Sequence, residues 1–186
     1  MSGCTVATAV ALLQQGEVIS YPTEAVYGLG CDPDNEAAVL SLLAIKQRPV
    51  EKGLILVAAT YSQLLPYVDD KAIPQEKRYQ IISSWPGHIS WVLPASKTAP
   101  KWITGNFSTI AVRVSAHPVV QQLCQQYGKP LVSTSANLAG EPAITDYQQL
   151  LATVGLKVAA IVDGALGGAA QPSQIRDAIS GQIVRS

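Results

Sequence analysis

The chain of 186 residues is 48% hydrophobic and 14% charged, and its 13 basic residues balance 13 acidic ones. This length suits one domain with a buried core, which we expect to span residues 1–186. The zero net charge argues against a dedicated, non-specific coat for nucleic acid, although a local basic patch remains compatible with it. No apolar run approaches the ~20 residues of a membrane helix, and the N-terminus lacks the layout of a secretory signal.

Short apolar runs alternate with helical patterns along the chain, which is typical of an α/β domain. In chain order, we expect helices over residues 5–15, 36–46, 62–67, 75–85, 118–127 and 147–153. We expect strands over residues 18–21, 54–57, 89–93, 110–114, 131–134, 158–163 and 183–185. The helix over 36–46 is the clearest, because Val39, Leu42 and Leu43 recur on one face and Asp34 or Asn35 can cap its start.

Cysteines and histidines are few and widely spaced. Cys4, Cys31 and Cys124 form no CxxC pair and are expected to be reduced thiols, as in a cytoplasmic protein. His88 and His117, the only histidines, have no metal-ligand neighbours at a useful spacing. We therefore expect no metal site formed by the protein.

The common phosphate-binding and nucleophile motifs do not occur. The chain lacks GxxxxGK[ST] and GxSxG, and Gly28 and Gly30 are not followed by the third glycine of a dinucleotide fingerprint. Four loops with unusual polar residues remain as candidate sites.

The first two loops have competing interpretations. In the loop over residues 21–30, Thr23 and Glu24 precede two glycines, and on these residues alone a tight turn with a hydrogen-bonded Thr–Glu pair is favoured. In the second loop, Lys46, Arg48 and Lys52 place three cations within seven residues. Such a cluster suits an anion, but basic residues also favour the last turn of a helix, so both interpretations stay open.

The other two loops follow predicted strands. Residues 133–137 bring four small polar side chains to the carboxyl end of a strand, where ligands of open α/β sheets gather, although an ordinary turn explains the same residues. Arg113, Ser173 and Arg185 make up the fourth group, and each is also compatible with a surface position.

Six segments together resemble one known family. They are residues 22–30 (PTEAVYGLG), 46–56 (KQRPVEKGLIL), 85–94 (WPGHISWVLP), 111–114 (AVRV), 133–140 (STSANLAG) and 172–177 (PSQIRD). In this order they resemble the YrdC-domain threonylcarbamoyl-AMP synthases, in their short bacterial single-domain form. The resemblance covers essentially the whole chain.

The resemblance implies a fold and a reaction. The fold is a single-domain, twisted, mixed β-sheet with flanking helices and a deep positive groove. The enzyme would be a cytoplasmic nucleotidyltransferase that condenses L-threonine, bicarbonate or CO2, and ATP into L-threonylcarbamoyladenylate and diphosphate, with Mg²⁺ carried on ATP. Downstream transferase proteins would then use the product to form N6-threonylcarbamoyladenosine at position 37 of ANN-decoding tRNAs.

The resemblance also assigns site residues. Lys46 and Arg48 would be catalytic. The nucleotide would be bound by Arg48, Lys52, Thr109, Ser135, Asn137 and Arg185. Threonine would be bound by Thr23, Tyr27, Arg113, Ser133 and Ser173.

This chain departs from the family pattern at three places. Ala25 and Val57 stand where many relatives have threonine and histidine, so amino-acid recognition must rely on other groups. His88 is an added imidazole in the segment over 86–90, which we interpret as a surface substitution rather than a catalytic base, whereas Ser90 keeps a hydroxyl.

A second hypothesis is a binding protein without chemistry. The cations Lys46, Arg48, Lys52 and Arg113 could hold tRNA or double-stranded RNA weakly, and such binding would fall steeply with salt. The neutral net charge ranks this hypothesis second.

Overall fold

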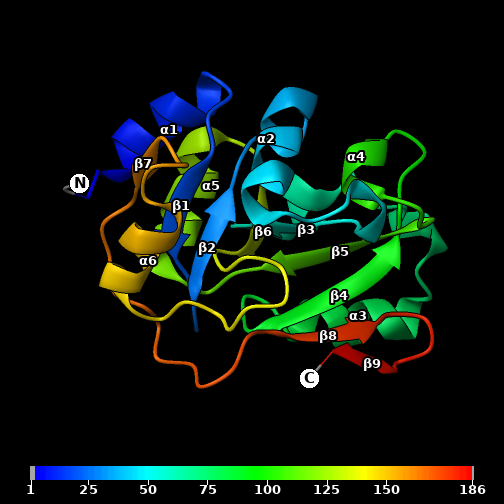
Figure 1. Cartoon of the computed structure of the whole chain (residues 1–186). Coiled ribbons are helices and arrows are strands. Elements are labelled where there is room, and N and C mark those ends of the chain that lie inside the picture. The colour runs from blue at the N-terminus through cyan, green and yellow to red at the C-terminus, as the bar shows by residue number, and fades with distance from the viewer. Residues whose placement is uncertain (1–2, 186) are drawn as a thin grey trace.

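A twisted sheet of mixed strand directions runs through the centre of the molecule (Figure 1). The structure is a computed structural model and describes residues 3–185. Within that range nine strands pair in the order β7-β1-β2-β6-β3-β5-β4-β8-β9. They are β1 (Ile19–Pro22), β2 (Tyr27–Gly30), β3 (Ile55–Ala58), β4 (Ile89–Pro94), β5 (Thr109–Val114), β6 (Leu131–Ser135), β7 (Ala160–Ile161), β8 (Gln174–Asp177) and β9 (Ile183–Arg185). The pairs β1–β7, β3–β5 and β4–β8 are parallel and the other neighbours are antiparallel, which confirms the predicted mixed α/β sheet.

Helices flank the sheet. They are α1 (Val6–Gln14), α2 (Glu36–Lys46), α3 (Gln75–Ser83), α4 (Lys101–Thr104), α5 (Pro118–Tyr127) and α6 (Tyr147–Val154), with short 3-10 turns at Val50–Lys52, Tyr61–Leu64 and Asp70–Ala72. Among residues 3–185, no helix combines the length and the apolar character needed to cross a bilayer.

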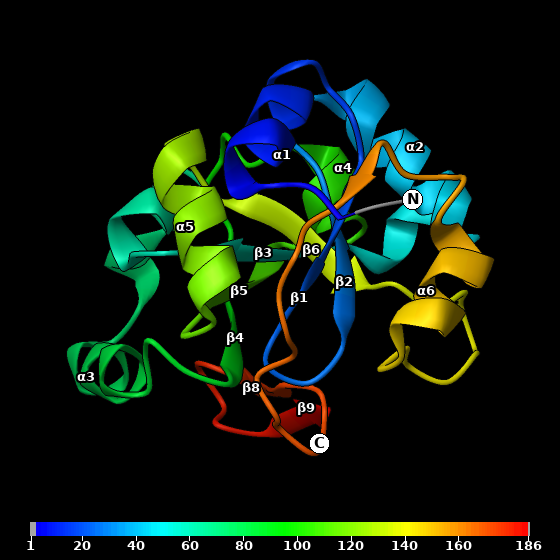
Figure 2. The ribbon, with the colours of Figure 1, turned by 90° about the vertical axis from the view of Figure 1, so that its left-hand side faces the viewer.

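Two hydrophobic clusters cover the two faces of the sheet. Figure 2 shows α1 and α5 side by side, and their buried residues Leu13 and Leu123 pack with Val57 of β3 and Leu131 of β6. The other cluster joins α2 to the opposite face, which includes Leu56. Because neighbouring side chains of a strand point to opposite faces, Leu56 and Val57 belong to different clusters.

The start and end of α2 follow local chemistry. Of the two candidate caps, Asn35 is the one that acts: its side chain accepts a hydrogen bond of 3.1 Å from the amide of Ala38. Asp34 instead pairs with Lys129 at 2.8 Å. After Lys46 the chain turns through Gln47, whose φ of 52° is left-handed, and this turn ends the helix.

Several elements differ from the sequence prediction. The helix expected over residues 62–67 is a 3-10 turn at Tyr61–Leu64, and the strand expected over 158–163 contracts to Ala160–Ile161. The sequence analysis missed α4, β2 and β8. Glycines concealed β2, because they disfavour strands in general, yet here they are required: a Cβ on Gly30 would lie 2.7 Å from both the Tyr21 ring and the carbonyl oxygen of Val132.

The strand register places one row of side chains across four strands. Ser133 of β6 pairs with Ile55 of β3, Ile55 pairs with Ala111 of β5, and Ala111 pairs with Val92 of β4. Cross-strand partners point to the same face of a sheet. Val57 of β3 points to this same face, and α1 and α5 cover the face at Val57. The row therefore lies beside these two helices.

Candidate functional site

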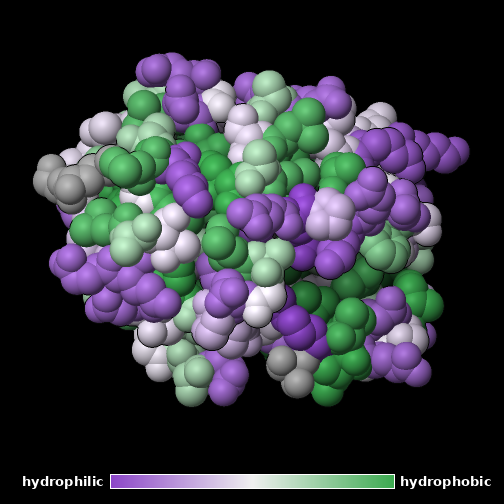
Figure 3. Space-filling view, in the orientation of Figure 1, coloured by the Kyte–Doolittle hydropathy of each residue, from purple (hydrophilic) through white to green (hydrophobic). Residues whose placement is uncertain are grey.

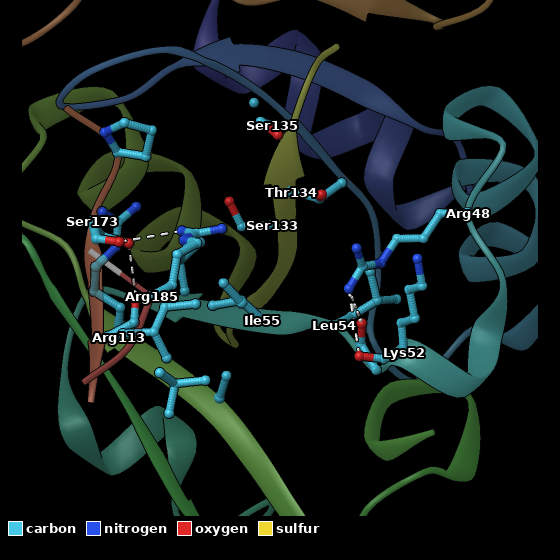
Figure 4. A pocket seen from close by; sticks show the side chains of 18 of the residues that line it. Arg48, Lys52, Leu54, Ile55, Arg113, Ser133, Thr134, Ser135, Ser173 and Arg185 are labelled. Atoms are coloured by element: carbon cyan, nitrogen blue, oxygen red, sulfur yellow. Dashed lines mark hydrogen bonds between the residues drawn. The ribbon is translucent and has the colours of Figure 1, made fainter. Parts of the chain in front are cut away.

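A cavity of about 590 Å³ opens over this row, whose four residues all line it. In the space-filling view, hydrophilic side chains gather near the middle of the face beside apolar surface (Figure 3). The close view shows Arg48 and Lys52 on one side and Arg113, Ser173 and Arg185 on the other (Figure 4). Residues 133–135 of β6 lie between the two groups. The cavity therefore has two cationic ends joined by hydroxyl groups.

The cavity concentrates the positive charge of a neutral chain. Five of the 13 basic residues line it, and Glu141 is the one acidic residue among the described lining residues. The basic ones are Lys46, Arg48, Lys52, Arg113 and Arg185. Burial first, and then the charges of Arg113 and Arg48, lower the pKa of Arg185, although a guanidinium remains protonated. Such a cavity attracts anions.

Arg48 is held at its end of the cavity by backbone oxygens. Its Nη2 donates to the carbonyl oxygen of Gly53 at 3.0 Å and to that of Lys52 at 3.4 Å. Burial lowers its pKa. These contacts use one side of the guanidinium fork, so the other donors can bind an incoming anion. Lys52 is exposed beside it and supplies a mobile charge.

Lys46 has a different environment from its neighbours. It is 4% exposed, and its Nζ donates to the carbonyl oxygens of Ser135 at 2.6 Å and Asn137 at 2.8 Å, with the Ser135 hydroxyl at 3.3 Å. Burial first, and then the charges of Arg48 and Arg185, lower its pKa to about 8. Lys46 thus ties the end of α2 to the loop after β6, and its three hydrogens have protein acceptors.

Arg113 marks the opposite end of the cavity. It is 6% exposed, so the expectation that it could be a simple surface residue is wrong. Its Nη1 lies 3.4 Å from Oε2 of Glu24 and 3.3 Å from Nδ1 of His88. Two side chains from distant loops therefore fix the direction of this guanidinium.

Glu24 is itself held by β5 and the residues after it. Its Oε1 accepts from the Ser115 hydroxyl at 2.7 Å and from the Ala116 amide at 3.2 Å. Burial alone would raise the pKa of Glu24, but Arg113 and the Ser115 hydrogen bond outweigh it and hold this pKa below its ordinary value. The carboxylate is therefore ionised. In place of the expected Thr–Glu pair, Thr23 donates to the carbonyl oxygen of Val26 at 2.6 Å.

Serine hydroxyls line the floor near Arg113. The hydroxyl of the buried Tyr21 donates to Ser133 at 2.9 Å, which leaves the Ser133 proton to a ligand. Ser90 and Ser173 share a hydrogen bond of 3.0 Å, and Arg185 donates to the Ser173 carbonyl oxygen at 3.2 Å. These contacts hold β8 and β9 against the cavity.

The structure brings all but one of the sequence-predicted site residues to the cavity. Those that line it are Thr23, Lys46, Arg48, Lys52, Thr109, Arg113, Ser133, Ser135, Asn137, Ser173 and Arg185. Tyr27 is the exception, because its side chain points to the opposite face of β2 from Gly28, into the core, where its ring lies 6.4 Å from that of Tyr147. Its assignment to threonine binding by direct contact is therefore corrected.

The structure also shows where the residues that depart from the family pattern lie. His88 is not an isolated surface substitution: it lines the cavity and contacts Arg113. Ala25 and Val57 line the cavity as well, so no hydroxyl or imidazole is present at these two places. Sequence reasoning had no signal for the meeting of Glu24, His88 and Arg113, since they come from three separate loops and strands.

Some buried polar atoms at the site have no partner within residues 3–185. They are Nε of Arg48, Nε of Arg113, Oδ1 of Asn137 and Oγ1 of Thr104, and all four residues line the cavity. An unpaired buried polar atom is costly, so such atoms are uncommon away from sites that bind a ligand. Their positions at both ends indicate that the cavity is built to be filled by a polar molecule.

The chain is similar to known proteins over nearly its whole length. Residues 11–186 match the Sua5_yciO_yrdC family model, described as telomere recombination. A threonylcarbamoyl-AMP synthase of Pseudoalteromonas translucida is 59% identical over 97% of both chains, and one of Escherichia coli O1:K1 is 51% identical over 100% of this chain and 97% of its own. The crystal structure of P. abyssi Sua5 complexed with L-threonine superposes with a TM-score of 0.86 at 32% identity, over 92% of this chain and 50% of that one. The chain thus spans about half the length of that Sua5.

Proposed function

The chain belongs to the Sua5/YciO/YrdC family, and we propose that its cavity condenses L-threonine, bicarbonate or CO2, and ATP into threonylcarbamoyl-AMP and diphosphate. Relatives that match almost the full chain carry the name of this activity, and a related Sua5 was crystallised with L-threonine. The observation that carries the proposal is the single cavity with cations at both ends. ATP and threonine are anionic at their phosphate and carboxylate groups, so each suits one end.

We place the triphosphate at the end formed by Arg48 and Lys52. The free donors of Arg48 can grip phosphate oxygens as a fork, and Lys52 can follow the charge as it moves. Lys46 holds the loop after β6 and so positions Ser135 and Asn137, whose side chains reach the same space. Thr109 and Arg185 line the cavity wall and complete the proposed nucleotide set.

We place threonine at the Arg113 end. The guanidinium suits its carboxylate, and Ser133 and Ser173 offer hydroxyl groups to its amine or hydroxyl. Thr23 lines the adjoining wall. Tyr27 contributes to this wall through its backbone, which bonds to Ala136 and Ile144, rather than through its side chain.

The proposed reaction needs no protein nucleophile. The threonine amine reacts with bicarbonate, with loss of water, or with CO2, with release of a proton, to give a carbamate. A carbamate oxygen then attacks the α-phosphorus of ATP, and the bond from that phosphorus to the leaving diphosphate breaks. Positioning the two reactants and neutralising the phosphate charge supply the catalysis. Because the AMP group of ATP is transferred to the carbamate, the enzyme is a nucleotidyltransferase. Mg²⁺ enters as part of the ATP complex.

The product is a reactive mixed anhydride and must be consumed by a following acyl transfer. We propose that downstream transferase proteins pass the threonylcarbamoyl group to tRNA in the cytoplasm. We also propose that residues 1–186 form a single domain with this activity, since one sheet contains β1 to β9 and one cavity is lined from β2, β3, β4, β5, β6, β8 and β9.

The proposal is tested with labelled bicarbonate. Purified protein is given ATP, Mg²⁺ and L-threonine, and diphosphate and label in the adenylate are measured together. We expect equal amounts of both, and little of either when L-valine, which lacks the hydroxyl of threonine, replaces it. Diphosphate release that does not depend on threonine would contradict the proposal.

A further inference from the structure

Two side chains that do not bind substrate in the proposed function contact Arg113. Glu24 supplies the countercharge at 3.4 Å, and His88 faces the same Nη1 at 3.3 Å. Arg113 is 6% exposed, so its guanidinium has little freedom outside these contacts. Its direction toward the cavity therefore depends on both partners.

The contacts of His88 fix the position of its proton. Nε2 lies 2.7 Å from the carbonyl oxygen of Gln171, which can only accept, so Nε2 carries the hydrogen. In the neutral ring Nδ1 then has a free lone pair and accepts from Nη1 of Arg113. Both ring nitrogens are engaged with the protein, so the lone pair of Nδ1 points at Arg113 and not at a substrate.

Protonation of His88 reverses this contact. A hydrogen on Nδ1 would point at the hydrogen of Nη1 and place two positive groups together. Arg113 of β5 contacts the ring, Glu24 after β1 interacts with it electrostatically, and Arg185 of β9 interacts in turn with Arg113.

From this geometry we infer that neutral His88 is a positioning residue that, together with Glu24, aims Arg113 at the threonine carboxylate, and that protonation of His88 weakens threonine binding. The inference rests on the proposed function, and it adds a pH-dependent control of amino-acid affinity. Histidine suits this task because its ordinary titration falls between about pH 5 and about pH 8.

The test compares three variants with the unmodified chain. His88→Asn keeps an acceptor near the place of Nδ1 but cannot titrate, and His88→Leu removes the acceptor. His117→Gln changes the other histidine, whose Nε2 contacts the carbonyl oxygen of Ala165 and not Arg113. For each protein, the Kd of threonine is measured by calorimetry, and the KM of threonine and of ATP by diphosphate release, from about pH 5.5 to about pH 8.5.

We expect the unmodified chain and His117→Gln to lose threonine affinity at the acid end of this range, with the KM of ATP changing little. His88→Leu should weaken threonine binding about tenfold at neutral pH, because it removes a hydrogen bond to a charged group. His88→Asn should restore most of this affinity and should not show the acid loss. The melting temperatures of all variants are measured in parallel.

Failure of the inference and failure of the proposed function give different results. If the unmodified protein makes adenylate but both His88 variants keep its threonine Kd and its pH profile, the inference is wrong and the proposed function stands. If the acid loss survives in His88→Asn, another group causes it and the inference is equally wrong. If the unmodified protein neither binds threonine nor releases diphosphate, both fall together.

Discussion

Replacing Arg48 by alanine tests whether this residue serves ligand binding in the cavity or the stability of the fold. The guanidinium makes two hydrogen bonds, to the carbonyl oxygens of Lys52 and Gly53, and no ion pair is recorded for it within residues 3–185. These oxygens lie at the cavity wall, where water can replace the lost donors. We therefore expect Arg48→Ala to leave the fold intact and to remove a phosphate contact.

The two effects differ in size. Loss of these two hydrogen bonds, whose carbonyl acceptors water can reach in the variant, costs about 1–2 kcal/mol of unfolding free energy, which lowers the Tm of a domain of this length by about 2–8 °C. Loss of one donor aimed at developing charge reduces kcat by about 100-fold or more. Arg48→Lys keeps the charge without the fork, so its activity should lie between those of the alanine variant and the unmodified protein.

Arg78 is the matched control. It also donates to two backbone oxygens, those of Asp70 and Ile73, and it lies outside the cavity lining, but unlike Arg48 it pairs with the Asp70 carboxylate at 3.3 Å, so Arg78→Ala should destabilise the fold at least as much as Arg48→Ala. Diphosphate release and thermal melts are recorded for Arg48→Ala, Arg48→Lys and Arg78→Ala. Full activity in Arg48→Ala, or unfolding of that variant at the assay temperature, would refute the reasoning, because Arg48 would then be dispensable or structural.

Three further predictions concern stability. Glu24→Gln leaves the Arg113 charge buried without its partner, so the free energy of unfolding, measured in urea, should fall by about 3 kcal/mol. Because the pKa of Glu24 is held low in the folded protein, the stabilisation by the Glu24 carboxylate should be lost in the unmodified protein as the pH falls toward that lowered pKa. The pKa of Lys46 is about 8 in the folded protein and 10.5 for an ordinary lysine, so between these values the unfolded chain binds more protons than the folded one. The free energy of unfolding of the unmodified protein should therefore rise, relative to that of Lys46→Met, as the pH rises across this interval. Equal pH slopes for the two proteins would exclude this prediction. Gly30→Ala should lower the Tm markedly, because its Cβ would lie 2.7 Å from the Val132 carbonyl oxygen. Gly128→Ala, whose Cβ meets no atom within 4 Å, carries only the strain of its left-handed φ of 84° and should lower the Tm less.

The sequence predicted those parts of the fold that depend on local patterns. The face of α2 with Val39, Leu42 and Leu43 is buried as expected, and the cap at Asn35 forms because its short polar side chain reaches a free amide of the first turn. The strand β2 was missed, since its glycines serve a contact with Tyr21 and Val132 that is distant in sequence.

The site could be predicted as a set of residues but not as an arrangement. The order of motifs identified the cations and hydroxyls, and the register of β6, β3, β5 and β4 then brought Ser133 and Arg113 over one face. The motifs could not show which side chains of the site form hydrogen bonds or ion pairs with one another. Lys46 binds backbone oxygens of the β6 loop, and Glu24 and His88 hold Arg113, and each of these pairings spans 25 to 91 residues of chain.

A crystal structure with L-threonine and a non-hydrolysable ATP analogue tests the central claim most directly. The account predicts the triphosphate against Arg48 and Lys52, the threonine carboxylate on Arg113, and the threonine amine between them and close to the α-phosphorus. Binding of the two ligands at separate surfaces, or a triphosphate that does not contact Arg48, would contradict it.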